Sequence, residues 1–156
     1  MSFIINKIPA SKNLKYFLIT FSIYFVFQFL TASIADYINP DLTKASHKFD
    51  SLSSEFIMVI IVAPIMETII FQYLIIETCL NLKLPALFCM ILSALLFGAS
   101  HFYNPVYAAV LTVVGFILAY YYMSLRHQGN INKVVLVIAL HALANMIAFF
   151  EKNFLI

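Results

Sequence analysis

The sequence predicts an all-α membrane protein, a polytopic bundle of about five transmembrane helices that forms one domain. Composition is the first reason: 63% of the 156 residues are hydrophobic and 10% are charged, against about 25% charged in an ordinary soluble domain. The second reason is a series of continuous apolar runs of about 20 residues, the length that a helix needs to cross a bilayer. These runs lack the alternation of barrel strands. The net charge of +2 argues against a nucleic-acid surface.

Prolines and polar residues set the limits of the runs. Pro40 closes the first run, and Pro85 and Pro105 suit the first turn of the third and the fourth. The expected helices cover residues 15–37, 55–78, 85–103, 105–125 and 133–150. We therefore expect a single membrane domain over 1–156. It consists of an N-terminal segment, first helix and polar loop in 1–54 and a four-helix core in 55–151.

Loop cations predict the orientation in the membrane, because cytoplasmic loops carry the excess of Lys and Arg. With a cytoplasmic N-terminus, the outer side carries three cations, Lys44, Lys48 and Lys152. The inner side then carries six, which are Lys7, Lys12, Lys15, Lys83, Arg126 and Lys133. Residue usage rich in Ile, Phe, Lys and Asn is typical of a bacterium with AT-rich DNA. We therefore expect an integral protein of the bacterial plasma (inner) membrane with its N-terminus in the cytoplasm.

Three ionisable residues fall within or near the expected hydrocarbon region, Glu67, His101 and His141. Each such group costs about 2.5–3.5 kcal/mol on insertion scales, so each needs a reason. Asn145 follows His141 by four residues and therefore shares its helix face. Pro64 is expected to kink the second helix one turn before Glu67. These features predict a polar pocket between helices.

Two kinds of chemistry fit this set of residues. A carboxylate can act as a general base on water, while imidazole and amide N–H groups hold the oxyanion of a tetrahedral intermediate. Alternatively, Glu67, His101 and His141 are two imidazoles and a carboxylate, a valid set of zinc ligands with one open position. The sequence has no HExxH motif, so it does not demand the metal.

Three segments resemble the CAAX protease and bacteriocin-processing (CPBP, or Abi) family of membrane proteases. They are APIMETIIFQ at 63–72, FGASH at 97–101 and HALAN at 141–145, which are similar to the family's EExxxR, FxxxH and HxxxN motifs. The resemblance covers roughly residues 56–150. It implies a glutamic intramembrane protease without a metal cofactor, with zinc as the alternative, that acts on a membrane-associated peptide or protein.

The resemblance also implies a role for each site residue. Glu67 is the catalytic base that activates water, and His101 orients that water. His141 and Asn145 form the oxyanion hole. The expected partners are membrane lipid and a peptide or protein substrate, with no nucleic acid.

Two positions depart from the first motif, because its second Glu is Thr68 and its Arg is Gln72. The motif nevertheless retains Glu67, and we interpret the chain as a CPBP-type endopeptidase with this residue as its catalytic base. The alternative is a degenerate family member that serves as a bacteriocin immunity or binding protein. A small proton-coupled transporter is a third hypothesis.

Outside the site, Glu77 is expected to lie at the membrane interface and to pair with Lys83.

Overall fold

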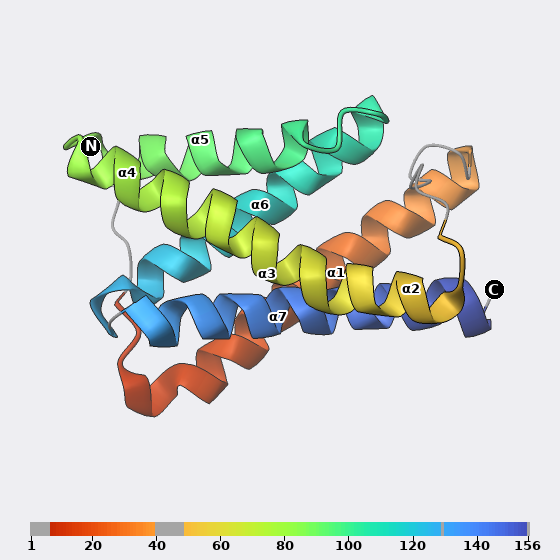
Figure 1. Ribbon diagram of the computed structural model, residues 1–156, viewed down its shortest axis with the longest axis horizontal. Helices are drawn as coiled ribbons and strands as arrows, with labels where there is room; N and C mark the ends of the chain where they lie inside the picture. The colour runs from red at the N-terminus through yellow and green to blue at the C-terminus, as the bar shows by residue number, and fades with distance from the viewer. Residues whose placement is uncertain (1–6, 40–48, 129, 156) are drawn as a thin grey trace.

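The computed structural model describes residues 7–39, 49–128 and 130–155 and confirms the all-α fold class. Within these ranges the chain is helical, without strands (Figure 1). The α-helices are α1 (Asn13–Ile38), α2 (Leu52–Phe56), α3 (Ala63–Glu67), α4 (Ile76–Asn81), α5 (Ala86–Ala99), α6 (Pro105–Leu125) and α7 (Asn130–Phe150). Short 3-10 helices are η1 (Ala10–Lys12) and η5 (Arg126–Gln128), and π-helical segments are η3 (Ile57–Val62), η4 (Thr68–Ile75) and η6 (Glu151–Leu155).

The second expected helix is one continuous path from α2 to α4, as Figure 1 shows. Its first turn is capped by Ser51, whose hydroxyl accepts a hydrogen bond from the Ser54 amide at 3.1 Å. Pro64 has no amide hydrogen, so the regular α-helical ladder cannot pass through it. The π-helical segments η3 and η4 lie on either side of α3, where the hydrogen-bond pattern changes. Such π-helical turns are frequent at functional sites.

Within the part of the chain that the structure describes, four helical stretches have the length and composition to cross a membrane: Ala10–Ala35, Leu52–Asn81, Pro105–Gln128 and Asn132–Phe154. The third expected helix is shorter than the sequence indicated, since α5 has 14 residues and ends at Ala99 rather than near residue 103. The cause is Asn104, whose side-chain oxygen accepts hydrogen bonds from the Val106 and Tyr107 amides and starts α6. His101 therefore lies in the turn between α5 and α6.

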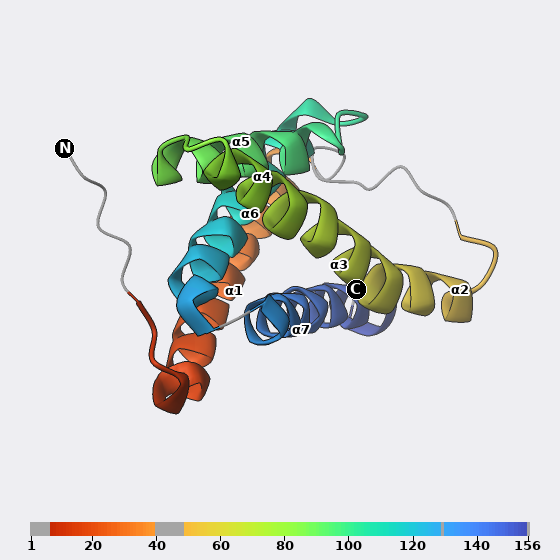
Figure 2. The ribbon, with the colours of Figure 1, turned by 60° about the vertical axis from the view of Figure 1, so that its left-hand side comes forward.

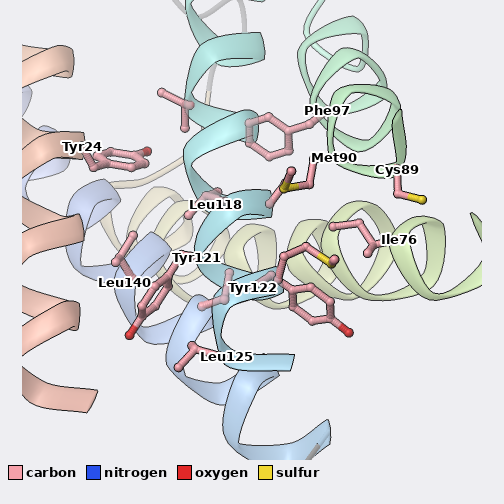
Figure 3. Close-up of a cluster of buried hydrophobic side chains, with 14 of the residues drawn as sticks. Tyr24, Ile76, Cys89, Met90, Phe97, Leu118, Tyr121, Tyr122, Leu125 and Leu140 are labelled. Carbon is pink, nitrogen blue, oxygen red and sulfur yellow. The ribbon is translucent and has the colours of Figure 1, made fainter. Parts of the chain in front are cut away.

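Helix α6 is the centre of the bundle. Its side chains at Leu118, Ala119 and Tyr122 are fully buried. Figure 3 shows α6 running between Phe97 and Met90 of α5 on one side and Leu140 of α7 on the other. A small residue lets α5 approach α6 closely, because a Cβ atom on Gly98 would lie 2.6 Å from the Ala108 carbonyl oxygen of α6.

Helix α1 lies on the outside of this core, against α6 and α7 (Figures 1 and 2). Its start is tied to the end of α6: the Ile8 amide donates to the Ser124 carbonyl at 3.0 Å, and Asn13 and Gln128 exchange side-chain hydrogen bonds. The polar loop expected at 39–54 falls mainly on residues 40–48, including Lys44 and Lys48, which lie outside the described residues.

Candidate active site

Three ionisable side chains from two helices and one turn meet at one point. Glu67 is the last residue of α3, His101 follows α5, and His141 lies in the middle of α7. One oxygen of the Glu67 carboxylate lies 3.9 Å from Nε2 of His101, and the other lies 3.6 Å from Nε2 of His141. The three side chains are 23%, 18% and 3% exposed, respectively. The structure therefore brings together the three groups that the sequence analysis singled out.

The orientation of the His101 ring is fixed by a backbone carbonyl group four residues earlier in the chain. Its Nδ1 lies 3.0 Å from the carbonyl oxygen of Phe97, one turn earlier in α5. Because a carbonyl oxygen only accepts, Nδ1 carries the proton in a neutral ring, and Nε2 presents its lone pair to Glu67. The hydroxyl of Ser100 also lies 3.0 Å from Nδ1.

Phe97 forms the wall between the two histidines. Its ring is fully buried and lies 5.5 Å from the His101 ring and 5.8 Å from the His141 ring, measured between centroids. A Cβ atom on Gly115 of α6 would come within 2.9 Å of this ring, so the glycine makes the space that Phe97 fills. The first and last residues of the FGASH segment thus act as one unit, because Phe97 packs the site and also accepts the hydrogen bond from His101.

Asn145 lies one turn after His141 on α7 and reaches the η3 segment. Its side-chain amide donates to the Val59 carbonyl at 2.9 Å. That amide group has two hydrogens, so this bond uses one of them. In the described part of the chain the contact holds Asn145 between α7 and η3, at the expected position on the His141 face.

Thr68 and Gln72, the two departures from the family motif, follow Glu67 along the same helix. Both are fully buried. The Thr68 hydroxyl and the Gln72 amide have no hydrogen-bond partner among the described residues. The same is true of Nδ1 of His141. Burial of such groups is costly unless they find a partner, so this part of the interior is unusually polar for a helix bundle in lipid.

The zinc alternative draws no support from the arrangement of the side chains. Among the described residues, no group of three or more His, Cys, Asp or Glu side chains is placed to hold a metal ion. The cysteines Cys79 and Cys89 are buried free thiols. The zinc alternative therefore stays a prediction for experiment.

A second charged cluster lies ten residues after Glu67, around Glu77. The Glu77 carboxylate accepts hydrogen bonds from Lys133 at 2.5 Å, from Tyr122 at 2.7 Å and from Arg126 at 2.9 Å. The expected pairing with Lys83 is thus wrong. Lys83 lies in the turn after α4 with a positive φ of 61°, whereas Arg126 of η5, directly after α6, and Lys133 of α7 pair with Glu77.

Sequence reasoning missed the aromatic surroundings of His101. Its ring lies 5.8 Å from the Tyr107 ring in an edge-on arrangement and 6.2 Å from the Tyr103 ring. The signal was present in the sequence, because Asn104-Pro105 is typical of a helix start. A turn this short keeps Tyr103 beside His101 and places Tyr107 on the first turn of the next helix.

A family model described as type II CAAX prenyl endopeptidase Rce1-like matches residues 50–147. The chain belongs to this family. No curated protein and no solved structure matches it. The matched segment contains Glu67, His101, His141 and Asn145 and leaves α1 outside. The resemblance to CAAX membrane proteases is thereby confirmed at the level of the family, and the chain is an integral membrane protein of that protease family.

Proposed function

We propose that this Rce1-like protein is an intramembrane endopeptidase in which Glu67 activates the attacking water. The observation that carries the proposal is the convergence of the Glu67 carboxylate with the His101 and His141 rings at 3.9 Å and 3.6 Å. Both distances exceed a direct hydrogen bond and suit polar groups that share a water molecule. Membership of a prenyl endopeptidase family supports the same reaction class.

The proposed reaction begins with proton transfer. Glu67 takes a proton from water while the water oxygen forms a bond to the carbonyl carbon of the scissile peptide. The carbonyl oxygen becomes an oxyanion. Glu67 then passes the proton to the peptide nitrogen, the C–N bond breaks, and a carboxylic acid and an amine leave. The carboxylate returns to its starting state.

The other residues hold the participants in place. Nε2 of His101 accepts a hydrogen bond from the attacking water, which fits the Nδ1 proton that Phe97 fixes. The His141 ring and the second amide hydrogen of Asn145 donate to the oxyanion. Tyr103 and Tyr107 form an aromatic edge beside His101 that suits an apolar substrate group.

Proteoliposomes that contain the purified chain test this proposal. The substrate is a farnesylated CAAX-type peptide with a fluorophore and a quencher on either side of the scissile bond. We expect cleavage by the wild type and its loss in Glu67→Gln, while Glu55→Gln on the same helix keeps full activity. Cleavage by Glu67→Gln at the wild-type rate would refute the role of Glu67. Activity that a chelator removes and zinc restores would favour the metal alternative.

The degenerate alternative, an immunity or binding protein, draws its support from Thr68 and Gln72. Both replace charged residues of the family motif and are buried without partners among the described residues. If the alternative holds, the wild type cleaves no peptide, and cells that express Glu67→Gln resist a bacteriocin as well as cells that express the wild type. Loss of both cleavage and protection in Glu67→Gln would rule it out.

A further inference from the structure

A groove of about 270 Å³ lies between α1 and α6, apart from the Glu67 site. Its volume is close to that of small ligand pockets, about 300 Å³. Most of its lining is aliphatic or aromatic, with Ile19 and Ile23 on α1 facing Phe116 and Ile117 on α6. Ile19 and Ile23 are 43% and 56% exposed on a helix that suits a membrane span. The groove therefore opens to hydrocarbon.

One polar group lies in this apolar surface, the Tyr121 hydroxyl. Tyr121 lines the groove, is 1% exposed, and its hydroxyl has no hydrogen-bond partner in the described ranges. Figure 3 shows its hydroxyl oxygen directed away from the α6 axis, toward α1. A buried hydroxyl without a partner is costly, so a ligand with an acceptor group gains by reaching it.

The end of the groove nearest the membrane surface is rich in cations. Ile8, Tyr16 and Ser124 line that end. The lysines next to the first two, Lys7 and Lys15, are exposed. Exposed Lys12 precedes Tyr16 by one turn, in the same stripe as Ile19 and Ile23. The carboxylate at this end of the described structure, Glu77, is already occupied by Arg126 and Lys133. Positive charge is therefore in excess at this end.

We propose that this groove binds an anionic phospholipid. The lysines at the mouth, Lys7, Lys12 and Lys15, face the phosphate, the Tyr121 hydroxyl donates to an ester carbonyl, and one acyl chain lies between α1 and α6. Along the groove, the cations come first, then the hydrogen-bond donor, then the apolar surface. A phospholipid presents its phosphate, its ester group and its acyl chain in the same order. The stripe from Lys12 to Ile23 covers about 16 Å at 1.5 Å per residue, close to one leaflet of a hydrocarbon core about 30 Å thick.

Native mass spectrometry of the purified chain tests the proposal. The protein in detergent receives equal amounts of dioleoyl-phosphatidylglycerol and dioleoyl-phosphatidylcholine. We expect the wild type to retain the anionic lipid at least about fivefold over the zwitterionic lipid. Thr20→Trp fills the groove and is expected to lower retention of both lipids at least fivefold. Ile34→Trp, on an exposed part of the same helix outside the groove, is expected to change neither.

Two further variants separate the parts of the site. The double variant Lys12→Gln, Lys15→Gln is expected to abolish the preference for phosphatidylglycerol without weakening phosphatidylcholine. Tyr121→Phe is expected to weaken both lipids about two- to tenfold, because one hydrogen bond is lost. This variant removes a single oxygen atom, so it decides the question if Thr20→Trp does not fold.

Three results would overturn the proposal. The first is equal retention of the two lipids by the wild type, which describes ordinary lipid around a membrane protein. The second is retention unchanged by Tyr121→Phe. The third is a dimer that Thr20→Trp dissociates, because a second copy of the chain is then the occupant. The site does not depend on the proposed peptidase activity, and Glu67→Gln is expected to retain lipid as the wild type does.

Discussion

Two glutamates on the same long helix have opposite surroundings. Glu77 is held by Lys133 at 2.5 Å, by Tyr122 at 2.7 Å and by Arg126 at 2.9 Å. Glu67, ten residues earlier, has two histidine rings as neighbours at 3.6 and 3.9 Å. Among the described residues, no Lys or Arg forms an ion pair with Glu67.

The difference distinguishes a carboxylate that stabilises the fold, Glu77, from one that is available for catalysis, Glu67. The oxygens of Glu77 are engaged by two cations and a hydroxyl, so they join α4, α6 and α7 and have little capacity left for water. The oxygens of Glu67 remain able to accept hydrogen bonds from water, because both histidine rings lie beyond hydrogen-bond distance. A third glutamate on this helix, Glu55, pairs near the surface with Lys152 and serves as the reference for both.

Glu67→Gln is expected to give the largest effect. The amide keeps the shape of the side chain but cannot take a proton from water, and loss of a general base lowers rates about 10²–10⁴-fold. The rate of peptide cleavage in proteoliposomes measures this loss. The temperature of unfolding in detergent is expected to stay near that of the wild type. Unfolding of this variant would instead place Glu67 beside Glu77 as a structural residue.

Glu77→Gln is expected to act on stability. It leaves Lys133, 2% exposed, without its carboxylate, and removal of one partner of a buried pair costs about 3–5 kcal/mol. At about 2–4 °C per kcal/mol, the unfolding midpoint falls by about 6–20 °C. Glu55→Gln breaks the exposed pair with Lys152 and is expected to cost at most about 1 kcal/mol. Equal midpoints for the two variants would contradict the contrast.

Gly98→Ala is expected to affect both stability and activity. The new Cβ atom would lie 1.9 Å from Oγ1 of Thr112 and 2.6 Å from the Ala108 carbonyl oxygen, so α5 must move away from α6. Overpacking of this kind costs about 1–3 kcal/mol, and the shift displaces His101 three residues later. Thermal unfolding and cleavage rate are measured on the same sample. A neutral result for both would mean that the close approach of α5 and α6 is dispensable.

Gln72→Met is expected to give the smallest effect, a gain in stability of about 1 kcal/mol. The change keeps the size of the side chain and removes a buried amide that has no partner in the described structure. Thr68→Val is the matching test for the hydroxyl. Thermal unfolding in detergent measures both variants. A loss of stability would mean that internal water pairs with these groups and that the polar interior is structural.

The sequence was informative where physical constraints are strong. The fold class followed from composition and from the cost of unpaired backbone groups in lipid. The cost of ionisable groups in a membrane picked out Glu67, His101 and His141, which the structure places together. Pairing could not be foreseen in the same way, because the choice of Arg126 and Lys133 over Lys83 for Glu77 depends on how α6 and α7 cross α4.

Helix ends were the other weak point. The sequence predicted a third helix to residue 103, because residues 86–99 and the Phe102-Tyr103 pair form nearly one apolar run. The capping bonds of Asn104 decide instead that the chain turns after Ala99. Local hydrogen bonds of this kind outweigh hydropathy over a few residues.

The shortness of α5 has a consequence for the bilayer. Its 14 residues cover about 21 Å at 1.5 Å per residue, against a hydrocarbon thickness of about 30 Å. A segment shorter than the hydrocarbon core is accommodated by local thinning of the bilayer or by flanking side chains that reach toward the interface. We therefore expect the headgroup layer to come closer to the turn after α5, which carries His101. Membrane thickness itself becomes a variable that sets how readily water reaches Glu67.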